Sequence, residues 1–333
     1  MMNEYLGTLP YHDPLYEILL SRVFTDVRDP LIHVNRMSHR RVYRYTEERT
    51  RTAIIGKFFE LHDAGNDRIR RLKGEYDNLE KLRSYGFDTF PNYVVRPITR
   101  DERIGLALTE EFVHGRDLDH YLKKAVYGGE WEGLKEKLSK LSAFLFALHE
   151  RTKTGAAMEL FPVGAYFLKI LNRLFEQKVI SDHDRGAYLK LMDRWLETEL
   201  FDGVEKVIVH GDATPTNFIF SRRGDVVAID LERMRQSDPV FDLGMICGEL
   251  KHAFMWRVRD PYPAERFIRH FLKSYAGWLR DAKRTFREIA LRNPFYMAMT
   301  ELRIARNEYL AWNYRNRLAH EAMECLRWGL KLK

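Results

Sequence analysis

The chain has 333 residues, 45% of them hydrophobic and 31% charged. This composition supports a sizeable buried core, which excludes a disordered tail, a collagen-like rod and a disulfide-stabilised miniprotein. No segment reaches the roughly 18 to 20 unbroken apolar residues of a membrane helix, and residues 1–10 lack the basic stretch and apolar run that are typical of a signal peptide. We therefore expect a folded cytoplasmic protein with no transmembrane segment and with two domains or two lobes.

The cysteines and the charge balance narrow the class further. Cys247 and Cys325 cannot build a disulfide framework, and neither lies in a zinc-binding spacing, so we expect free thiols. The 55 basic and 48 acidic residues leave a net charge of +7, which points to an anionic partner.

The first third of the chain is rich in strand patterns. Residues 41–45 alternate apolar and polar side chains, and residues 52–59 form a nearly continuous apolar run. Residues 67–85 repeat apolar side chains at helical spacing and end near Gly86. Residues 106–109 predict a further short strand.

Helical patterns dominate beyond residue 110. Residues 134–149 carry leucines along one helical stripe, and the second half is helical apart from a compact β segment over residues 207–231. We therefore predict an α+β fold with a β-rich N-terminal lobe, a mostly helical C-terminal lobe and a cleft between them.

The β segment carries the strongest chemical signal. Residues 207–209 form a buried strand that runs into the polar loop 210–217. Residues 218–220 and 226–229 then pair as a hairpin, with a polar turn between them.

This hairpin is expected to gather oxygen ligands. Counting outward from a pair between Phe220 and Val226 brings Asn217 within one residue of Asp230, and Asp212 lies on the preceding loop. Amide and carboxylate oxygens are the ligands that Mg²⁺ prefers. Phosphoryl transfer needs positioning and charge neutralisation more than covalent help, so Asp212 is the candidate base and Asn217 and Asp230 are the candidate metal ligands.

Three blocks then follow one another in a specific order. They are His210-Gly-Asp212 with Asn217, Ile229-Asp-Leu-Glu232, and Asp238-Pro-Val-Phe-Asp-Leu-Gly244. Together they resemble the aminoglycoside phosphotransferase and choline kinase group within the protein-kinase-like superfamily, over roughly residues 33 to 245. The resemblance implies a bilobal protein-kinase-like fold and transfer of the γ-phosphoryl group of ATP, with Mg²⁺, to a hydroxyl group.

The resemblance also assigns residues in the first lobe. Lys57 would contact the α- and β-phosphates and pair with Glu75; the alternative is an edge-strand lysine that discourages aggregation. Residues 110–115 resemble the hinge, where the carbonyl of Glu111 and the amide of Val113 would meet the adenine. The alternative for this segment is an acidic connector between domains.

Three residues near the loop have supporting roles in this interpretation. His210 would brace the loop, and Asp242 would hold it through backbone contacts, cap a helix, or do both. Glu232 would reach a second metal or point to solvent. Residues 37–41 contain no glycine, which argues for a small-molecule kinase against a protein kinase and leaves Ser38 and His39 as candidates for cradling the phosphates.

These assignments divide the chain. Residues 1–109 form the N-lobe, with a helical N-terminal extension, an antiparallel sheet and the helix that carries Glu75. Residues 110–115 form the hinge. Residues 116–333 form the helical C-lobe, which contains the catalytic loop, the metal-binding hairpin and C-terminal substrate helices, and the nucleotide would lie between the lobes.

The charge distribution bears on the acceptor. Residues 251–333 hold 18 basic and eight acidic side chains, a net charge of +10, which leaves −3 for the rest. We hypothesise a neutral or anionic small-molecule acceptor, such as a sugar or sugar derivative, that binds near some of four arginines. The alternative is that these arginines lie on a solvated face and do not contact the acceptor. The arginines are Arg257, Arg259, Arg303 and Arg306.

Other functions remain open at this point. A kinase of a glycolipid or a protein, an aminoglycoside- or choline-type kinase, and a nucleotide-binding pseudokinase scaffold are the alternatives. No nucleic-acid partner is expected, because the basic residues form no long single-sign run and no binding module is recognisable.

Overall fold

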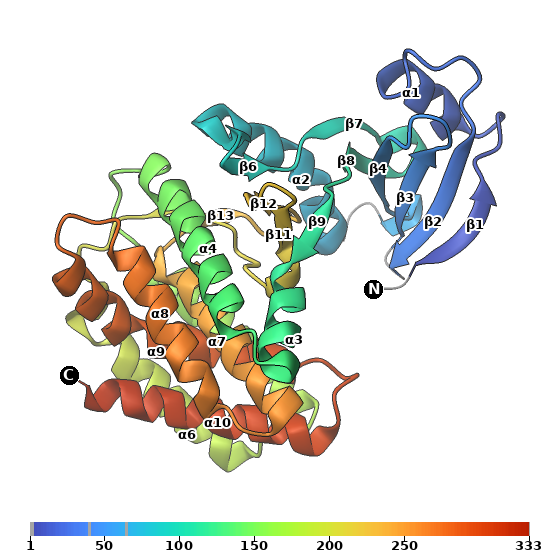
Figure 1. Ribbon diagram of the computed structural model, residues 1–333. Coiled ribbons are helices and arrows are strands. Elements are labelled where there is room, and N and C mark those ends of the chain that lie inside the picture. The colour runs from blue at the N-terminus through green and yellow to red at the C-terminus, as the bar shows by residue number, and fades with distance from the viewer. Residues whose placement is uncertain (1–2, 39–40, 64–65, 333) are drawn as a thin grey trace. The chain divides into compact units, whose positions relative to one another are not determined.

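The computed structural model describes residues 3–38, 41–63 and 66–332. It divides into two compact units (Figure 1). Unit 1 comprises Met1–Gly115 and Ile219–Arg233, and unit 2 comprises Arg116–Phe218 and Met234–Lys333. The hairpin after the polar loop, which the sequence division placed in the C-lobe, therefore groups with the N-terminal part of the chain.

Unit 1 is built on a six-stranded sheet. Its neighbouring strands pair antiparallel, and the predicted strands over 41–45, 52–59 and 106–109 are confirmed. In sheet order the strands are β1 (Glu4–Thr8), β2 (Ile32–Ser38), β3 (Val42–Glu47), β4 (Ala53–Phe58), β8 (Leu106–Glu111) and β7 (Pro97–Asp101).

The start of the chain differs from the expected helical extension. Strand β1 comes first and pairs with the edge of the sheet, and helix α1 (Pro14–Arg22) follows it. Asp13 caps α1, whose Leu19 packs with Tyr45, Ile54 and Leu106 in one apolar core. Pairing with β2 defines this strand, whereas the Asp13 cap and Pro14 define where α1 starts.

A helix and most of a second sheet complete unit 1. Helix α2 (Asp67–Leu82) is capped by Asn66 and continues into a wider turn, Arg83–Phe87, where Gly86 takes a φ of 82°. The second sheet has the order β5, β6, β12, β11, β9, and β12 pairs in parallel with β6. Its strands are β5 (Asp88–Thr89), β6 (Asn92–Val94), β12 (Val226–Ala228), β11 (Phe218–Ser221) and β9 (Gly115–Asp117). The parallel pairing explains why the hairpin groups with unit 1.

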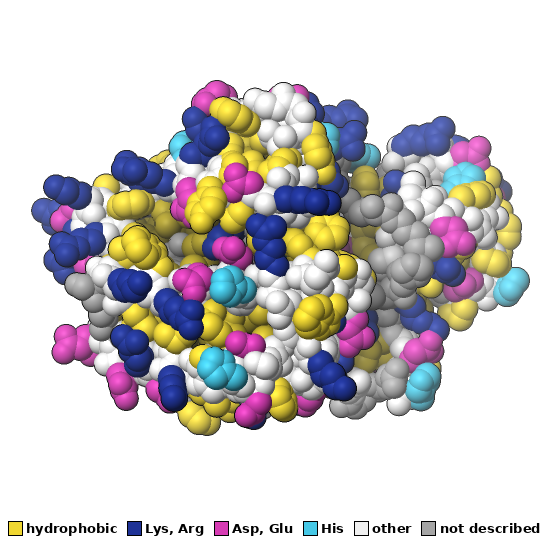
Figure 2. All heavy atoms as spheres, turned by 90° about the horizontal axis from the view of Figure 1, so that it is seen from below, with side chains coloured by type: hydrophobic (Ala, Val, Ile, Leu, Met, Phe, Trp, Pro, Cys, Tyr) yellow, Lys and Arg dark blue, Asp and Glu magenta, His cyan; other side chains and the backbone are white. Residues whose placement is uncertain are grey.

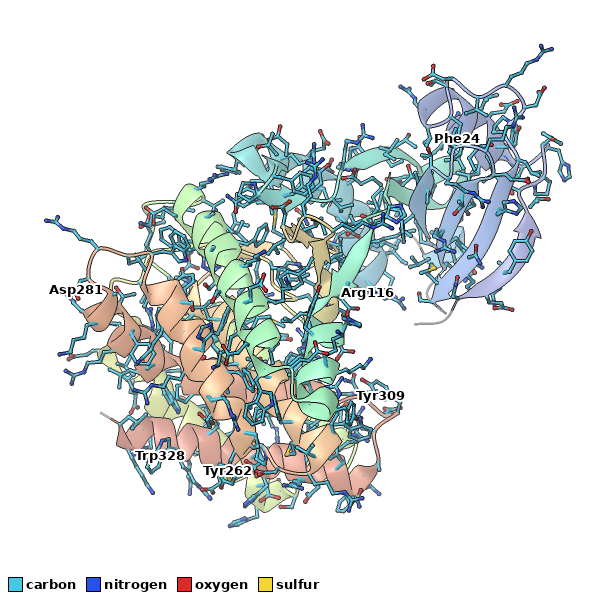
Figure 3. The ribbon with its side chains drawn as sticks, in the orientation of Figure 1. Phe24, Arg116, Tyr262, Asp281, Tyr309 and Trp328 are labelled. Carbon is cyan, nitrogen blue, oxygen red and sulfur yellow. The ribbon has the colours of Figure 1, made fainter. Side chains whose placement is uncertain are left out.

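Unit 2 is mostly helical, which confirms the predicted fold class. Its helices are α3 (Leu118–Gly128), α4 (Trp131–Arg151), α5 (Leu160–Glu176), α6 (Asp182–Leu196), α7 (Val240–Val258), α8 (Glu265–Ala276), α9 (Ala282–Ala305) and α10 (Trp312–Lys331) (Figures 1 and 3). Two short strands, β10 (Val207–Val209) and β13 (Arg235–Ser237), pair antiparallel. Both cysteines are free.

Short helical turns lie between these elements. They are Leu61–Asp63, Glu102–Ile104, Glu199–Phe201, Pro215–Asn217 and Tyr262–Ala264.

Glycine lets helices α7 and α9 approach closely. A Cβ added at Gly244 would lie 2.3 Å from the Cβ of Tyr296, and one added at Gly248 would lie 2.8 Å from the Cβ of Thr300. The two glycines are one turn apart, as are the two residues that they face. This seam sets the position of α9 against α7, and both helices carry residues of the candidate site.

Candidate active site

Unit 1 surrounds one lysine with carboxylates. Strand β4 holds Lys57, whose side chain is 8% exposed and whose Nζ lies 2.7 Å from Glu75 Oε1. The same Nζ lies 3.4 Å from Asp230 Oδ1 and 3.5 Å from Glu110 Oε1. The structure thus brings the two residues predicted as a pair into contact and adds Glu110, which the sequence reasoning missed.

One ammonium group faces three carboxylates in this cluster. Burial by itself would lower the pKa of Lys57, but Glu110, Glu75 and Asp230 outweigh it and hold that pKa well above its usual value. Burial raises the pKa of Glu75 to about 8 against the opposing effect of Lys57, and it also raises the pKa of Glu110. Carboxylates crowded in this way favour an additional cation or a proton.

Asp230 adopts a left-handed backbone conformation, with a φ of 63°. The residue after it is held on both sides by α2: Leu231 N–H donates to Glu75 Oε1 at 3.1 Å, and Asn78 Nδ2 donates to the Leu231 carbonyl at 2.8 Å. A non-glycine residue in this conformation costs about 1–2 kcal/mol and is enriched at functional sites. Its carboxylate is 37% exposed, so it is open to a ligand.

The predicted hinge residues lie where β8 ends. Glu111 is the last residue of β8, and its Oε1 accepts from Tyr93 Oη at 2.5 Å and from Arg96 N at 2.8 Å. Val113 belongs to the irregular link that follows and is half-buried. Of the candidate phosphate-cradling residues, Ser38 ends β2, whereas His39 lies outside the described residues.

In unit 2 the polar loop is braced from α7. Asp242 is fully buried and accepts from the backbone N–H of His210 at 2.6 Å and of Gly211 at 3.1 Å. Its Oδ2 lies 3.5 Å from His149 Nε2, and His149 Nδ1 lies 2.9 Å from Tyr275 Oη. Burial would raise the pKa of Asp242, but His149 and the backbone N–H groups lower it, so the carboxylate stays charged.

The loop presents Asp212 beside an arginine. Arg303 Nη2 lies 2.5 Å from Asp212 Oδ1, and the side chains are 15% and 16% exposed, respectively. Asn217 Nδ2 donates to the Asp212 carbonyl at 2.8 Å, which directs the amide nitrogen into the loop and leaves Asn217 Oδ1 as an acceptor.

Asn217 ends the polar loop, as the sequence predicts. It is the last residue of the turn Pro215–Asn217, one residue ahead of β11. The turn forms because Pro215 starts it and Asn217 N–H donates to the Thr214 carbonyl at 3.0 Å. Glu232, whose side chain is 14% exposed, lies 3.5 Å from Arg233 Nε, so it is largely shielded from solvent.

The four candidate substrate arginines are dispersed. Arg303 contacts Asp212, whereas Arg257 Nη2 lies 2.5 Å from Asp119 Oδ1. Arg259 ends α7, and Arg306 lines a separate cavity against α5. Figure 2 shows Lys and Arg side chains interspersed with acidic and apolar ones on the visible face.

Some of the basic side chains that give residues 251–333 their net charge of +10 form ion pairs inside unit 2. Lys251 Nζ lies 3.3 Å from carboxylate oxygens of both Glu301 and Glu321, and Arg292 Nε lies 3.7 Å from Asp238 Oδ2. The basic excess is therefore partly structural, which weakens it as a guide to the acceptor.

A cavity of about 370 Å³ opens beside the loop. It is lined by Thr214–Thr216 of the loop, by residues of α3 and α7, and by Tyr309, which projects from the connection between α9 and α10 (Figure 3). The α7 residues include Glu249 and Trp256, and Trp256 is half exposed. Burial raises the pKa of Glu249 to about 7, opposed by Arg303 and reinforced by Asp212.

Two of the predicted site residues, one in each unit, offer oxygen atoms of the kind that bind magnesium. Within the described residues, no group of three or more His, Cys, Asp or Glu side chains is arranged as a metal cage. Mg²⁺ in phosphoryl-transfer sites takes one or two protein oxygens and completes its shell with phosphate oxygens and water. The exposed carboxylate of Asp230 and the Oδ1 of Asn217 are oxygen ligands of that kind.

Comparisons with known proteins identify the family and similar folds. The model of the phosphotransferase enzyme family matches residues 34–284. The choline kinase LicA from Streptococcus pneumoniae is 17% identical, with a TM-score of 0.51 over 95% of this chain and 100% of that chain. An ethanolamine kinase from Plasmodium vivax is 12% identical, with a TM-score of 0.63 over 96% and 90% of the two chains.

A further similar structure is the streptomycin–ATP–APH(2″)-IIa ternary complex, which is 13% identical, with a TM-score of 0.54 over 96% of this chain and 97% of that chain. No curated protein sequence matches the chain. At these identities the structural matches establish the fold. Among the described helices, none is long and apolar enough to cross a membrane.

Proposed function

Because the chain belongs to the phosphotransferase enzyme family, we propose that it transfers the γ-phosphoryl group of ATP to a hydroxyl of a small molecule in a Mg²⁺-dependent reaction. The observation that carries this proposal is Asp212, a carboxylate on a loop whose backbone is held by the buried Asp242. A proton acceptor for an attacking hydroxyl needs such fixed placement.

The remaining residues divide the binding tasks. In this proposal Lys57, aligned by Glu75, binds the nucleotide phosphates, and the hinge groups of Glu111 and Val113 bind the adenine. Asp230 and Asn217 hold the Mg²⁺, which neutralises phosphate charge when bound. The carboxylate excess around Lys57 supports cation binding at Asp230, because an added positive charge relieves it.

We place the acceptor in the cavity beside the loop. Its charged lining consists of the Asp119–Arg257 ion pair and Glu249, and the half-exposed Trp256 offers a flat apolar face. Paired charges donate and accept hydrogen bonds without a large net charge, and aromatic faces stack on sugar rings. This lining favours a neutral polyhydroxylated acceptor such as a sugar within the hypothesised neutral or anionic class.

The test is an ATP-consumption screen over grouped acceptors: neutral sugars, sugar phosphates, aminoglycosides, and choline with ethanolamine. Turnover with sugars supports the proposal, whereas preferential turnover of aminoglycosides or choline would overturn the acceptor class. Failure of the wild-type protein to bind Mg–ATP by calorimetry would overturn the kinase assignment itself. ATP binding without turnover in any group, including glycolipids and proteins, would favour a pseudokinase scaffold.

Two variants check the residue roles. Asp212→Asn is expected to keep nucleotide affinity within a few-fold of wild type while losing turnover; retention of more than about a tenth of the activity contradicts the base assignment. Asp230→Ala is expected to weaken Mg–nucleotide binding itself. Unchanged calorimetric affinity of that variant would contradict its metal role.

A further inference from the structure

Arg303 places a largely shielded positive charge beside the candidate base. It projects from the last turns of α9, and its Nη2 lies 2.5 Å from Asp212 Oδ1. Within the described part of the chain, Asp212 is the one carboxylate at ion-pair distance from this guanidinium. The two charges therefore offset each other in the resting protein.

This pairing leaves part of the guanidinium available. Its Nη1 lies 3.8 Å from the sulfur of Met245, a weak acceptor, and no oxygen among the described residues accepts from Nε or Nη1. A guanidinium has five N–H donors in a planar fork. Arg303 can therefore hold Asp212 with one edge and still donate to another oxygen anion.

A neutralising partner has a chemical consequence for a base. A carboxylate in a tight ion pair is a weaker proton acceptor than a solitary one, so Arg303 would hinder Asp212 if its only role were to hold this carboxylate. The hindrance is offset if the arginine stabilises charge elsewhere during the same step. Interactions that strengthen in the transition state are the ones that accelerate a reaction.

On the basis of the proposed kinase function, we infer that Arg303 is a catalytic residue. Its guanidinium neutralises the Asp212 carboxylate in the resting protein and stabilises the negative charge of the phosphoryl group during the reaction. The acceptor oxygen forms a bond to the γ-phosphorus, and the hydroxyl proton moves to the Asp212 carboxylate. The bond between the γ-phosphorus and the bridging oxygen breaks, and its electron pair stays on ADP. As Asp212 becomes neutral, the charge of Arg303 is released to the oxygens of the transferring group.

This role gives an opposite prediction for two neighbouring substitutions. Asp212→Asn mimics the protonated base and frees the arginine, whereas Arg303→Met removes the charge and keeps an unbranched apolar side chain. Aluminium fluoride with Mg–ADP serves as the probe, because it mimics the transferring phosphoryl group with water in place of the acceptor. The measurement is the affinity of Mg–ADP with and without aluminium fluoride, by calorimetry.

Wild type is expected to bind Mg–ADP more tightly when aluminium fluoride is present. Asp212→Asn should increase this tightening about 10-fold, and Arg303→Met should reduce it about 100-fold or more while Mg–ADP affinity changes less than about 3-fold. Arg303→Lys, which keeps the charge but not the fork, should lie between them. Arg287→Met is the matched control, because Arg287 is an exposed arginine on the same helix.

Stability is controlled separately. Arg303→Met leaves Asp212 without its cation, so the double variant Asp212→Asn with Arg303→Met, which removes both charges, is measured beside it by thermal unfolding. If the arginine acts as inferred, the tightening gained by Asp212→Asn disappears in the double variant even where the double variant is as stable as wild type.

Two results overturn the inference. The first is that aluminium fluoride increases the affinity for Mg–ADP equally in wild type and in Arg303→Met. The second is that the larger increase seen in Asp212→Asn persists in the double variant. Either result means that Arg303 only positions the loop. Failure of wild type to bind Mg–ADP at all would instead overturn the proposed function, so the two failures are distinguishable.

Discussion

The close approach of α7 and α9 makes Gly244 a sensitive position. In Gly244→Ala the new Cβ would lie 2.3 Å from Tyr296 Cβ, 3.1 Å from Tyr296 C and 3.2 Å from Met297 N, whereas ordinary contact begins at 3.4 Å. These are backbone and Cβ atoms that cannot rotate away, so the helices must separate by about 1 Å. Overpacking typically costs about 1–3 kcal/mol, and the better helix propensity of alanine returns about 1 kcal/mol.

We therefore expect Gly244→Ala to lose up to about 2 kcal/mol in the free energy of unfolding, measured by urea titration followed by circular dichroism. The matched control is Gly186→Ala in α6, where no heavy atom lies within 4 Å of the added Cβ. That variant should gain about 0.5–1 kcal/mol from helix propensity alone. If Gly244→Ala is as stable as Gly186→Ala, the close-packing argument is refuted.

The same substitution should also affect turnover. Asp242 lies two residues before Gly244, and Arg303 lies two helical turns after Tyr296, so a shift of α9 against α7 separates the groups that hold Asp212. A displacement of about 1 Å can lower the rate about 100-fold. Gly186→Ala should leave turnover unchanged, because α6 carries no residue of the candidate site.

Two further predictions concern ionisation. Asp242→Asn should lose about 3–5 kcal/mol in the free energy of unfolding at pH 7, because two N–H groups lose a charged acceptor. The pKa of Asp242 is lowered, so its contribution is present above its unfolded pKa and is lost as the pH falls through the folded value. The difference from wild type in urea unfolding should therefore narrow as the pH falls below about 4. A gap that stays constant between pH 7 and pH 3 contradicts this role. The folded pKa of Glu249, about 7, exceeds its unfolded pKa, so wild type loses stability as the pH rises from 4.5 to 7. Over this range the free energy of unfolding of Glu249→Gln should therefore rise by about 1–3 kcal/mol relative to wild type. Equal dependence of the free energy of unfolding on pH in the two proteins contradicts that raised pKa.

Local patterns predicted most of the fold. The strands β3, β4 and β8 and the helix α2 follow from alternation and helical spacing within short windows, and the stop near Gly86 follows from its positive φ. Strand β1 was missed because residues 4–8 show no strict alternation. The strand is instead defined by pairing with β2 across an intervening helix.

The candidate site was only partly predictable, for a related reason. Lys57, Glu75 and Asp230 could be found because each lies within a recognisable block. Glu110 was assigned to the hinge, yet it shares the face of the sheet that holds Lys57 because β4 and β8 pair in a specific register.

Long-range contacts in unit 2 carried even less sequence signal. Arg303 is separated from Asp212 by 91 positions in the chain, and their contact depends on how α9 packs on α7. His149 belongs to a predicted helix, but its place beside Asp242 follows from the packing of that helix against the loop.

The parallel pairing of β12 with β6 has a consequence for the order in which the chain can fold during synthesis. Residues 226–228 pair with residues 92–94, and the ribosome must first make the intervening segment Arg116–Phe218, which belongs to the other unit. At about 5–20 residues per second that segment takes roughly 5–20 s to emerge. The six-stranded sheet, complete by Glu111, can form during this delay, whereas strand β6 waits with one edge unpaired. A nascent chain stalled near residue 150 would therefore present this edge to chaperones, and one stalled beyond about residue 270, with residue 233 outside the exit tunnel, would not.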